Sequence, residues 1–318
     1  MLFFAALALV ALPREVCACA SCGCSLSGDA AMGYSAAAGW RFSVEYDYIH
    51  QDQLRSGTHA VSEVPDGYEL ERETLNRYIT AGISYSPNSA WSVTLYAPYV
   101  ARTHSTHGEV DSSQPLPQLS SSRSASLGDV RLVGAYQGFL ATRNLGVTLG
   151  VKLPTGATDV RFYGGPLSGE PLDASLQPGT GSTDVLVGAY YYRAIAQDWD
   201  AFANGLFQAA VHERRNEAGD DFRPGDAVTV SAGVRYVASP RLLPQLQVNF
   251  VHKAPDTGAL ADLQSSAGSV VYLSPGLSVA LTRHVGIFGF VQLPLYSNLY
   301  GYQLFPRWTA SVGASYAL

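Results

Sequence analysis

Hydrophobic and polar residues alternate strictly over the last stretch of the chain, residues 305–318. A period of two predicts a β-strand, because successive side chains of a strand point to opposite faces. The residues between the apolar ones are small or polar. Such a strand fits between lipid and a wet lumen, and it also fits at the end of a soluble sandwich. The predicted apolar face carries Trp308, Ala310, Val312, Ala314, Tyr316 and Leu318.

The same alternation recurs in eleven earlier stretches, so the sequence predicts about twelve strands, with ten or fourteen as open alternatives. In the first stretch, three charged residues share the face opposite the apolar row. A dry core does not accept such charges without partners, whereas a wet lumen does. The earlier stretches are 40–48, 79–85, 91–99, 130–136, 145–151, 185–191, 199–207, 228–236, 246–250, 271–279 and 285–295.

The connections between these stretches alternate in length. Short links follow the even-numbered stretches, and longer links follow the odd-numbered ones, including the eleventh. A chain that meanders across a membrane has this alternation, with short turns in the periplasm and long loops outside. A Greek-key sandwich gives no reason for it. The sequence therefore predicts an all-β fold, a transmembrane antiparallel up-and-down β-barrel in the bacterial outer membrane, with a rim of aromatic residues beside the turns.

The first residues predict export. Residues 1–12 form an apolar run that is too short for a membrane-spanning helix, which needs about 20 residues. The run fits a signal peptide over residues 1–20, with cleavage after Ala18-Cys19-Ala20. A lipoprotein signal and a buried N-terminal element are the alternatives. We expect a periplasmic Cys-containing segment over residues 21–38 and the barrel over residues 39–318.

The composition of the chain indicates which kinds of binding partner to expect. Charged residues make up 14% of the chain, below the roughly 25% of soluble domains. The net charge is -6 and no basic stripe occurs, which argues against nucleic acid as a partner. We expect contact with outer-membrane lipid and lipopolysaccharide, and a small-molecule solute. The oligomeric state stays open.

Charged residues at alternating positions are candidates for the lining of the lumen. Opposed charges there would select small polar solutes. An alternative lining by Phe202, Phe288 and Phe290 would instead guide apolar ones. The charged candidates for the solute path are Arg41, Glu45, Asp47, Arg77, Asp129, Arg131, Lys152 and Arg235.

Four cysteines near the N-terminus form a C-x-C-x-x-C-x-C pattern at residues 17–24, which is typical of a soft-metal site. Cleavage at Ala20 would leave Cys22 and Cys24, two ligands short of a closed zinc site. A metal pair completed by another group, a redox pair and a cleavage-region accident are the open alternatives. Otherwise we expect no cofactor.

Other candidate chemistry is weak. His104 and His107 have spacing for a shared metal but no third ligand nearby, so a solvated loop is the better interpretation. No arrangement of Ser, His and an acid is selected by its spacing, so we expect a protein that is not an enzyme.

Four separated motifs carry a family resemblance. They are Ser126–Asp129, Leu149–Gly156, Leu176–Ser182 and Phe222–Asp226. In this order they resemble the outer-membrane family named for the meta-pathway of phenol degradation, whose members are regarded as transporters. The resemblance implies a barrel that moves small, aromatic or hydrophobic molecules, and it implies no catalytic residues. One departure is the final Leu318, where many outer-membrane barrels end in Phe.

The sequence therefore predicts a channel or transporter with passive passage through the lumen. The alternative function is an outer-membrane anchor or binding protein whose Cys-x-Cys segment holds a metal or a redox partner.

Overall fold

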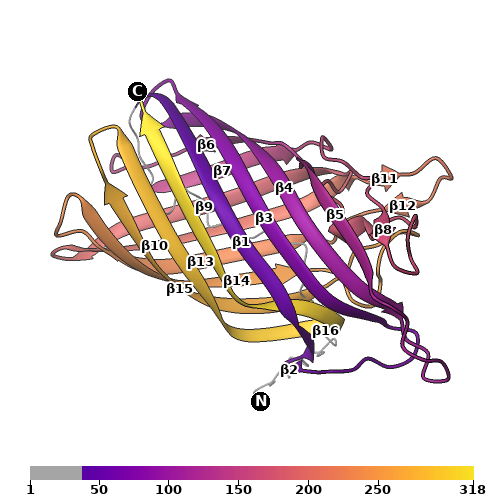
Figure 1. Cartoon of the computed structure of the whole chain (residues 1–318). Helices are drawn as coiled ribbons and strands as arrows, with labels where there is room; N and C mark the ends of the chain where they lie inside the picture. Colours follow the sequence, from indigo (N-terminus) through magenta and orange to yellow (C-terminus); the bar gives the residue numbers. More distant parts are fainter. Residues whose placement is uncertain (1–37) are drawn as a thin grey trace, which may run out of the picture.

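The computed structural model describes residues 38–318, and the predicted alternation is present as long antiparallel strands (Figure 1). β1 pairs with β16 on one side and with β3 on the other, so the sheet closes into a barrel. Closure leaves no open edge, as a membrane-spanning sheet requires. The strands of the wall are β1 (Gly39–Gly57), β3 (Glu69–Ser86), β4 (Trp91–Glu109), β6 (Arg131–Tyr136), β7 (Leu145–Lys152), β9 (Thr183–Ala196), β10 (Trp199–His212), β13 (Ala227–Tyr236), β14 (Leu242–Lys253), β15 (Gly268–Ala280) and β16 (Val285–Ala317).

β16 contains two passes across the barrel. Its first part pairs with β15 from Gly286 to Leu299, and its last part pairs with β1 up to Ala317. The chain reverses near Gly301, whose φ of 65° lies in the left-handed region that glycine adopts without strain. The eleven wall strands thus make twelve passes, as predicted. The expected long link after the eleventh pass is wrong, because both passes continue almost to this reversal.

β5 (Ser120–Leu127) and β6 form one interrupted pass. β5 pairs with the loop-side half of β4, and β6 pairs with its turn-side half. The residues between them, 128–130, leave the ladder. The remaining short elements belong to the connections: β2 (His59–Ala60), β8 (Phe162–Gly164), β11 (Arg214–Arg215), β12 (Asp221–Phe222) and the 3-10 helix η1 (Ala174–Leu176).

No helix in the described part of the chain has the length and apolar character to cross a membrane.

The two faces of the wall differ as predicted. In the closing strand, Val312 is 53% exposed on the outer face, whereas Ser311 is 2% exposed on the inner face. At the turn end, aromatic pairs stack across neighbouring strands, with ring centroids 4.7 Å apart for Trp40 and Tyr85 and 4.5 Å apart for Trp91 and Tyr136. Such aromatic girdles lie at membrane interfaces. The protein is a transmembrane β-barrel of the bacterial outer membrane.

Candidate functional site

Most of the charged side chains predicted for the lumen do face it. Arg41, Glu45, Asp47, Arg131, Lys152 and Arg235 occupy inner positions of their strands, and Asp129 lies at the interruption between β5 and β6. Arg235 pairs with Asp200 at 3.2 Å, and Asp47 accepts a hydrogen bond from Ser311 at 2.5 Å. Their role in passing a solute remains a prediction.

Arg77 is the exception, and its predicted place in the lumen is wrong. Its neighbour Asn76 is 1% exposed on the inner face and accepts a hydrogen bond from Arg102. Because side chains alternate along a strand, Arg77 points outward with Ile79, and both are exposed.

The interruption between β5 and β6 is centred on Asp129. Its carboxylate accepts hydrogen bonds from the backbone N–H of Gly156 at 3.0 Å and of Thr180 at 2.9 Å, and from the Thr180 hydroxyl at 2.8 Å. Three of the four motifs that carry the family resemblance therefore meet around one buried carboxylate. We call this place, residues 128–130 with 153–156 and 178–182, the wall break.

Lys152 binds the wall break to β9. Its ammonium group lies 2.9 Å from Asp184 and 3.4 Å from Asp129, and all three residues are buried. It also donates to the hydroxyls of Thr180 and Ser182. Removing one partner of such a buried pair costs about 3–5 kcal/mol, because the other charge is left uncompensated.

Close backbone packing explains the glycines of these motifs. A Cβ added at Gly156 would lie 2.6 Å from the Cα of Gly179, and one at Gly128 would lie 3.2 Å from the carbonyl of Pro178. Only glycine permits the approach at Gly156 and Gly179, so these residues let the connection fit into the wall.

The connection over residues 153–182, here called the lumen loop, is bonded to the inner wall. Arg102 on β4 donates to the carbonyls of Leu176 and Gln177. Phe162, Leu172 and Leu176 form a small apolar cluster within the loop. β8 adds two pairings to β5, through Ser121 and Ser122.

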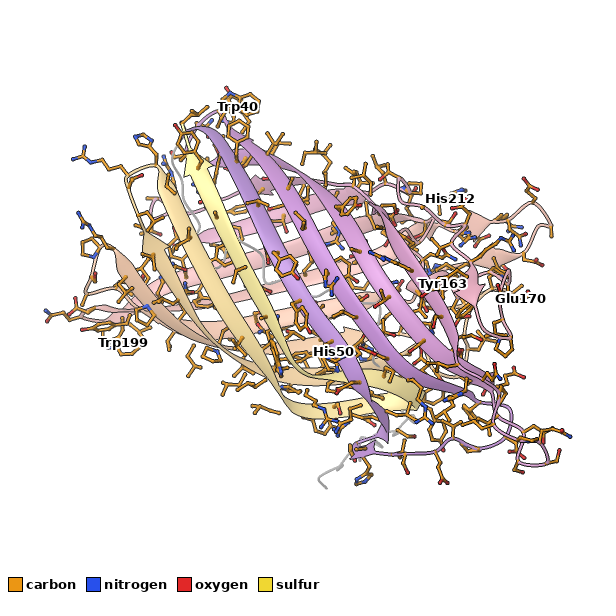
Figure 2. The ribbon with its side chains drawn as sticks, viewed as in Figure 1. Trp40, His50, Tyr163, Glu170, Trp199 and His212 are labelled. Carbon is orange, nitrogen blue, oxygen red and sulfur yellow. The ribbon has the colours of Figure 1, made fainter. Side chains whose placement is uncertain are left out.

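The strands of the barrel wall are short next to the wall break. β7 has 8 residues, fewer than the about 9–11 that a tilted strand needs to span the apolar band. Above it, β5 meets only the lumen loop on that side. The outer surface near the wall break is apolar, with Leu127 58% and Leu149 65% exposed. Tyr163 on β8 is 69% exposed (Figure 2). Side chains and a loop, rather than a continuous strand ladder, therefore close the barrel here.

Aromatic rings lie flat against the inner wall where the neighbouring strand carries glycine. Phe290 covers Gly276, Phe288 covers Gly313 and Phe202 covers Gly233, at distances that exclude a Cβ. All three rings are buried. The predicted apolar lining is thus present beside the charged one, on the β10–β16 side of the lumen.

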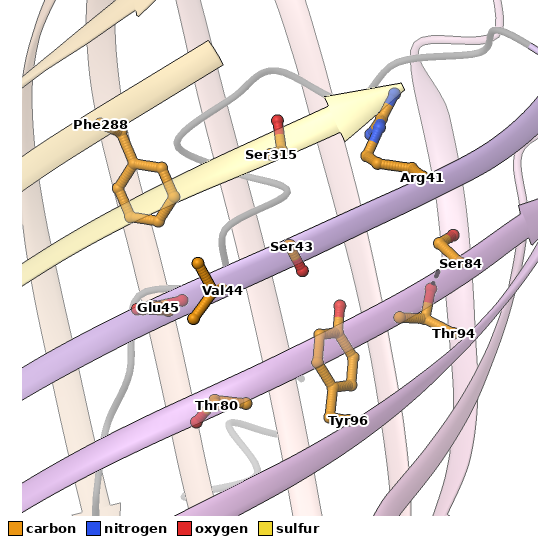
Figure 3. Close-up of a pocket in the computed structure, with 10 residues that line it drawn as sticks. All are labelled: Arg41, Ser43, Val44, Glu45, Thr80, Ser84, Thr94, Tyr96, Phe288 and Ser315. Atoms are coloured by element: carbon orange, nitrogen blue, oxygen red, sulfur yellow. Dashed lines mark hydrogen bonds between the residues drawn. The ribbon is translucent and has the colours of Figure 1, made fainter. Parts of the chain in front are cut away.

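A pocket opens at the turn end of the lumen (Figure 3). Phe288 lies on one side of it and Tyr96 on the other, with Glu45 on β1 between them and Arg41 farther toward the end of β16. Thr94 donates to Ser84 at 3.0 Å in the same wall. Charged and hydroxyl groups therefore share the lining of the pocket with the apolar surfaces of Val44, Tyr96 and Phe288. Its lining residues are Arg41, Ser43, Val44, Glu45, Thr80, Ser84, Thr94, Tyr96, Phe288 and Ser315.

Acidic groups gather at the loop end. Asp173 of the lumen loop interacts with Glu69 and Asp262, and Glu71 lies near all three. The Asp173 side chain keeps contact with solvent, but partial desolvation by the surrounding protein raises its pKa to about 6, and the charge of Asp262 adds to the rise.

The two histidines do not form a shared site. His104 is buried on the inner face of β4 and bonds to Thr74 at 2.8 Å, so its expected place in a solvated loop is wrong. His107 bonds to the carbonyl of Pro117 at 2.7 Å. A spacing of three places them on opposite faces of the strand.

No group of His, Cys, Asp and Glu suited to a metal ion occurs among residues 38–318. Cys22 and Cys24, the predicted metal or redox pair, lie outside the described residues, as do the predicted signal peptide and nearly all of the N-terminal segment.

Sequence reasoning missed Asp184, the second carboxylate beside Lys152. The alternation along this strand could have identified it, because Asp184 lies on the opposite face from Val185 and on the same face as Leu186. The wall break itself left no such signal, because its contacts join segments far apart in the chain.

Comparison with known proteins finds similar solved structures but no match by sequence. No family model matches the sequence, and no curated protein matches it. The crystal structure of an outer-membrane channel from Pseudomonas putida F1 is similar over 89% of this chain and 96% of that chain, with a TM-score of 0.61 and 12% identity.

Two further solved structures have lower scores. The monoaromatic hydrocarbon channel CymD has a TM-score of 0.44 and 10% identity, over 88% of this chain and 89% of that chain. The translocator domain of the autotransporter NalP from Neisseria meningitidis has a TM-score of 0.48 and 9% identity, over 89% of each chain. At these identities, the channel from P. putida shows a shared fold.

Proposed function

We propose that this protein is a passive outer-membrane channel for small apolar or aromatic molecules, which enter the lumen sideways through the wall break. The observation that carries the proposal is the short β7 beside the interrupted β5–β6 pass. There the wall is completed by the lumen loop and by the bonds of Asp129 and Lys152. These few side-chain bonds can break and open the wall without separating two hydrogen-bonded strands.

The route after entry follows the inner wall. Tyr190 lies over Gly146 at the turn end of β7, and Phe202 and Phe290 line the β10–β16 side. These rings are buried, so an aromatic solute stacks on them where it displaces the neighbouring side chains that cover them. The pocket at the turn end, lined by Phe288 and Tyr96 together with charged and hydroxyl groups, then releases the solute toward the periplasm. The family resemblance of the motifs around Asp129 supports this class of solute.

A disulfide that holds β8 against β5 tests the route. Ser122 and Phe162 are paired residues of the two strands, and paired Cα atoms lie within the range that a disulfide spans. In Ser122→Cys/Phe162→Cys, we expect oxidation to lower uptake of a small aromatic hydrocarbon into proteoliposomes and reduction to restore it. Ion conductance in planar bilayers should stay the same in both states.

Each single cysteine variant is the control, because it changes packing without forming the bond. If oxidation lowers ion conductance and aromatic uptake equally, entry is along the barrel axis and sideways entry is wrong. If the wild-type barrel gives no uptake of aromatic solutes above that of empty liposomes, the channel function itself is wrong.

A further inference from the structure

Two arginines on the outer wall have no bonding partner in the described part of the chain. Arg77 on β3 and Arg123 on β5 are both exposed, and neither takes part in a hydrogen bond or ion pair within residues 38–318. Other charges on this part of the outer wall form pairs, His50 with Glu73 at 2.8 Å and Arg307 with Asp52 at 3.1 Å. Arg161, which the β5–β8 register places beside Arg123, donates to the carbonyl of Gly169 at 2.7 Å. Arg77 and Arg123 therefore present free positive charge outside the barrel.

The two arginines flank a floor of small side chains on β4. Arg77 pairs with Ala101, and Arg123 pairs with Thr103 from the other side. Two strand spacings put the backbones of β3 and β5 about 10 Å apart. We call these four residues the arginine shelf. Its guanidinium groups are free to reach over the small residues toward a common ligand.

The shelf lies at a defined height in the membrane. Ala101 is ten positions along β4 from Trp91, which belongs to the aromatic girdle at the turn end. Ten residues of a strand tilted by about 45° rise roughly 25 Å, the height of the apolar band. Below the shelf the outer face is apolar, with Ile79, Tyr99 and Leu127 exposed. The arginine shelf is therefore level with the head groups of the outer leaflet.

We propose that the arginine shelf binds the phosphate groups of an anionic glycolipid of the outer leaflet, of the lipid A type. Guanidinium groups bind phosphate through two parallel hydrogen bonds, which a hydrophobic barrel wall does not otherwise provide. With their two-residue stagger along β4, the backbones of the two arginines lie about 12 Å apart, within the reach of two guanidinium groups toward a disaccharide head group that carries one phosphate at each end. The acyl chains then lie on the apolar surface beneath, next to the wall break. The proposal does not depend on the transported solute.

Native mass spectrometry of the full-length barrel in detergent tests this binding. The probes are bisphosphorylated lipid A, its monophosphorylated form and phosphatidylglycerol. For Arg77→Gln/Arg123→Gln we expect bisphosphorylated lipid A to bind about tenfold more weakly than to the wild type. The wild type should bind the monophosphorylated form less tightly, and phosphatidylglycerol least.

Arg193→Gln is the matched control, because Arg193 is an exposed outer-face arginine on β9 near the turn end, on the opposite rim. It should bind bisphosphorylated lipid A like the wild type. Circular dichroism and heat-modified gel migration report whether each variant has folded. Three results would overturn the proposal: unchanged binding in the double variant, an equal loss in Arg193→Gln, or phosphatidylglycerol binding that matches lipid A and depends equally on the two arginines.

Discussion

Single residues in this barrel take their direction from strand parity, which the sequence makes visible. Lys152 and Asp47 are predicted to face the lumen, and both do so and are buried there. Arg77 was misplaced because its charge was weighed above its parity with Ile79. The partners of Asp129 were not predictable, because they are backbone groups of a connection with no periodic pattern. Parity thus predicts which face a side chain occupies but does not predict what it binds.

The glycine under Phe290 provides a test at the residue scale. A methyl group at Gly276 would lie 2.1 Å from Cδ1 of Phe290, so Gly276→Ala should turn the ring into the lumen. We expect a cost of about 1–3 kcal/mol in folding stability and a several-fold fall in aromatic uptake, with assembly retained. Uptake into proteoliposomes measures the effect.

The second change Phe290→Leu should restore uptake in the Gly276→Ala background, because it removes the displaced ring. Uptake that stays low in the double variant would mean that the ring does not lie on the path.

Elements were predicted better than their ends. The twelve passes and the short turns follow from alternation and turn chemistry. The lengths of β1, β3 and β4 exceed the predicted stretches, because their loop-side halves lie above the lipid. There both faces are polar or mixed and the alternation fades. The predicted strand 130–136 began one residue too early, since Val130 continues the apolar row although its backbone has left the ladder.

The closing strand tests the assignment of its faces. Val312 faces lipid near mid-height, where a lysine costs about 2–4 kcal/mol, so Val312→Lys should reduce membrane assembly. Alternation alone predicts that any charge at Ser311 is tolerated. Because Ser311 contacts the carboxylate of Asp47, we expect a positive charge at position 311 to be tolerated and a negative charge to be repelled. The folded fraction in outer-membrane preparations should be near wild type for Ser311→Lys and low for Val312→Lys, and the reverse order would contradict the register.

The lumen loop should bind less firmly as the pH rises. Burial and Asp262 raise the pKa of Asp173 to about 6, so the bound loop holds this proton more tightly than the free loop, whose carboxyl has its ordinary pKa of 3.8. The stabilisation is complete below pH 3.8 and is lost as the pH rises through 6. Asp173 keeps contact with solvent, so the loss is smaller than full burial would give.

Hydrogen exchange of residues 160–176, followed by mass spectrometry between pH 4 and 8, measures this loosening. Glu69, Glu71 and Asp262 face Asp173 and carry like charge, while Arg102 holds the loop at Leu176 throughout. Asp173→Asn is the control and should show only the intrinsic pH dependence of exchange. Identical profiles for the wild type and Asp173→Asn would show that this carboxyl does not control the loop.

At the scale of the whole molecule, alternating long and short connections predicted both closure and orientation. Closure follows because β1 meets β16, and the aromatic girdle marks the turn end. The wall break was beyond prediction, because it arises from a strand that is too short and a loop that fills its place. A period-two pattern records which side chains meet lipid, but it carries no information about where the ladder is missing.

Orientation is open to a direct test with inserted epitopes. Residue 113 lies in the exposed connection between β4 and β5, and residue 88 lies in the turn between β3 and β4. Both sites are exposed, so short insertions there should leave the barrel folded. An epitope after Ser113 should bind antibody on intact cells, whereas one after Asn88 should bind only after the outer membrane is permeabilised. The opposite labelling pattern would mean that the barrel is inserted in the reverse orientation, with the wall break and the arginine shelf in the inner leaflet.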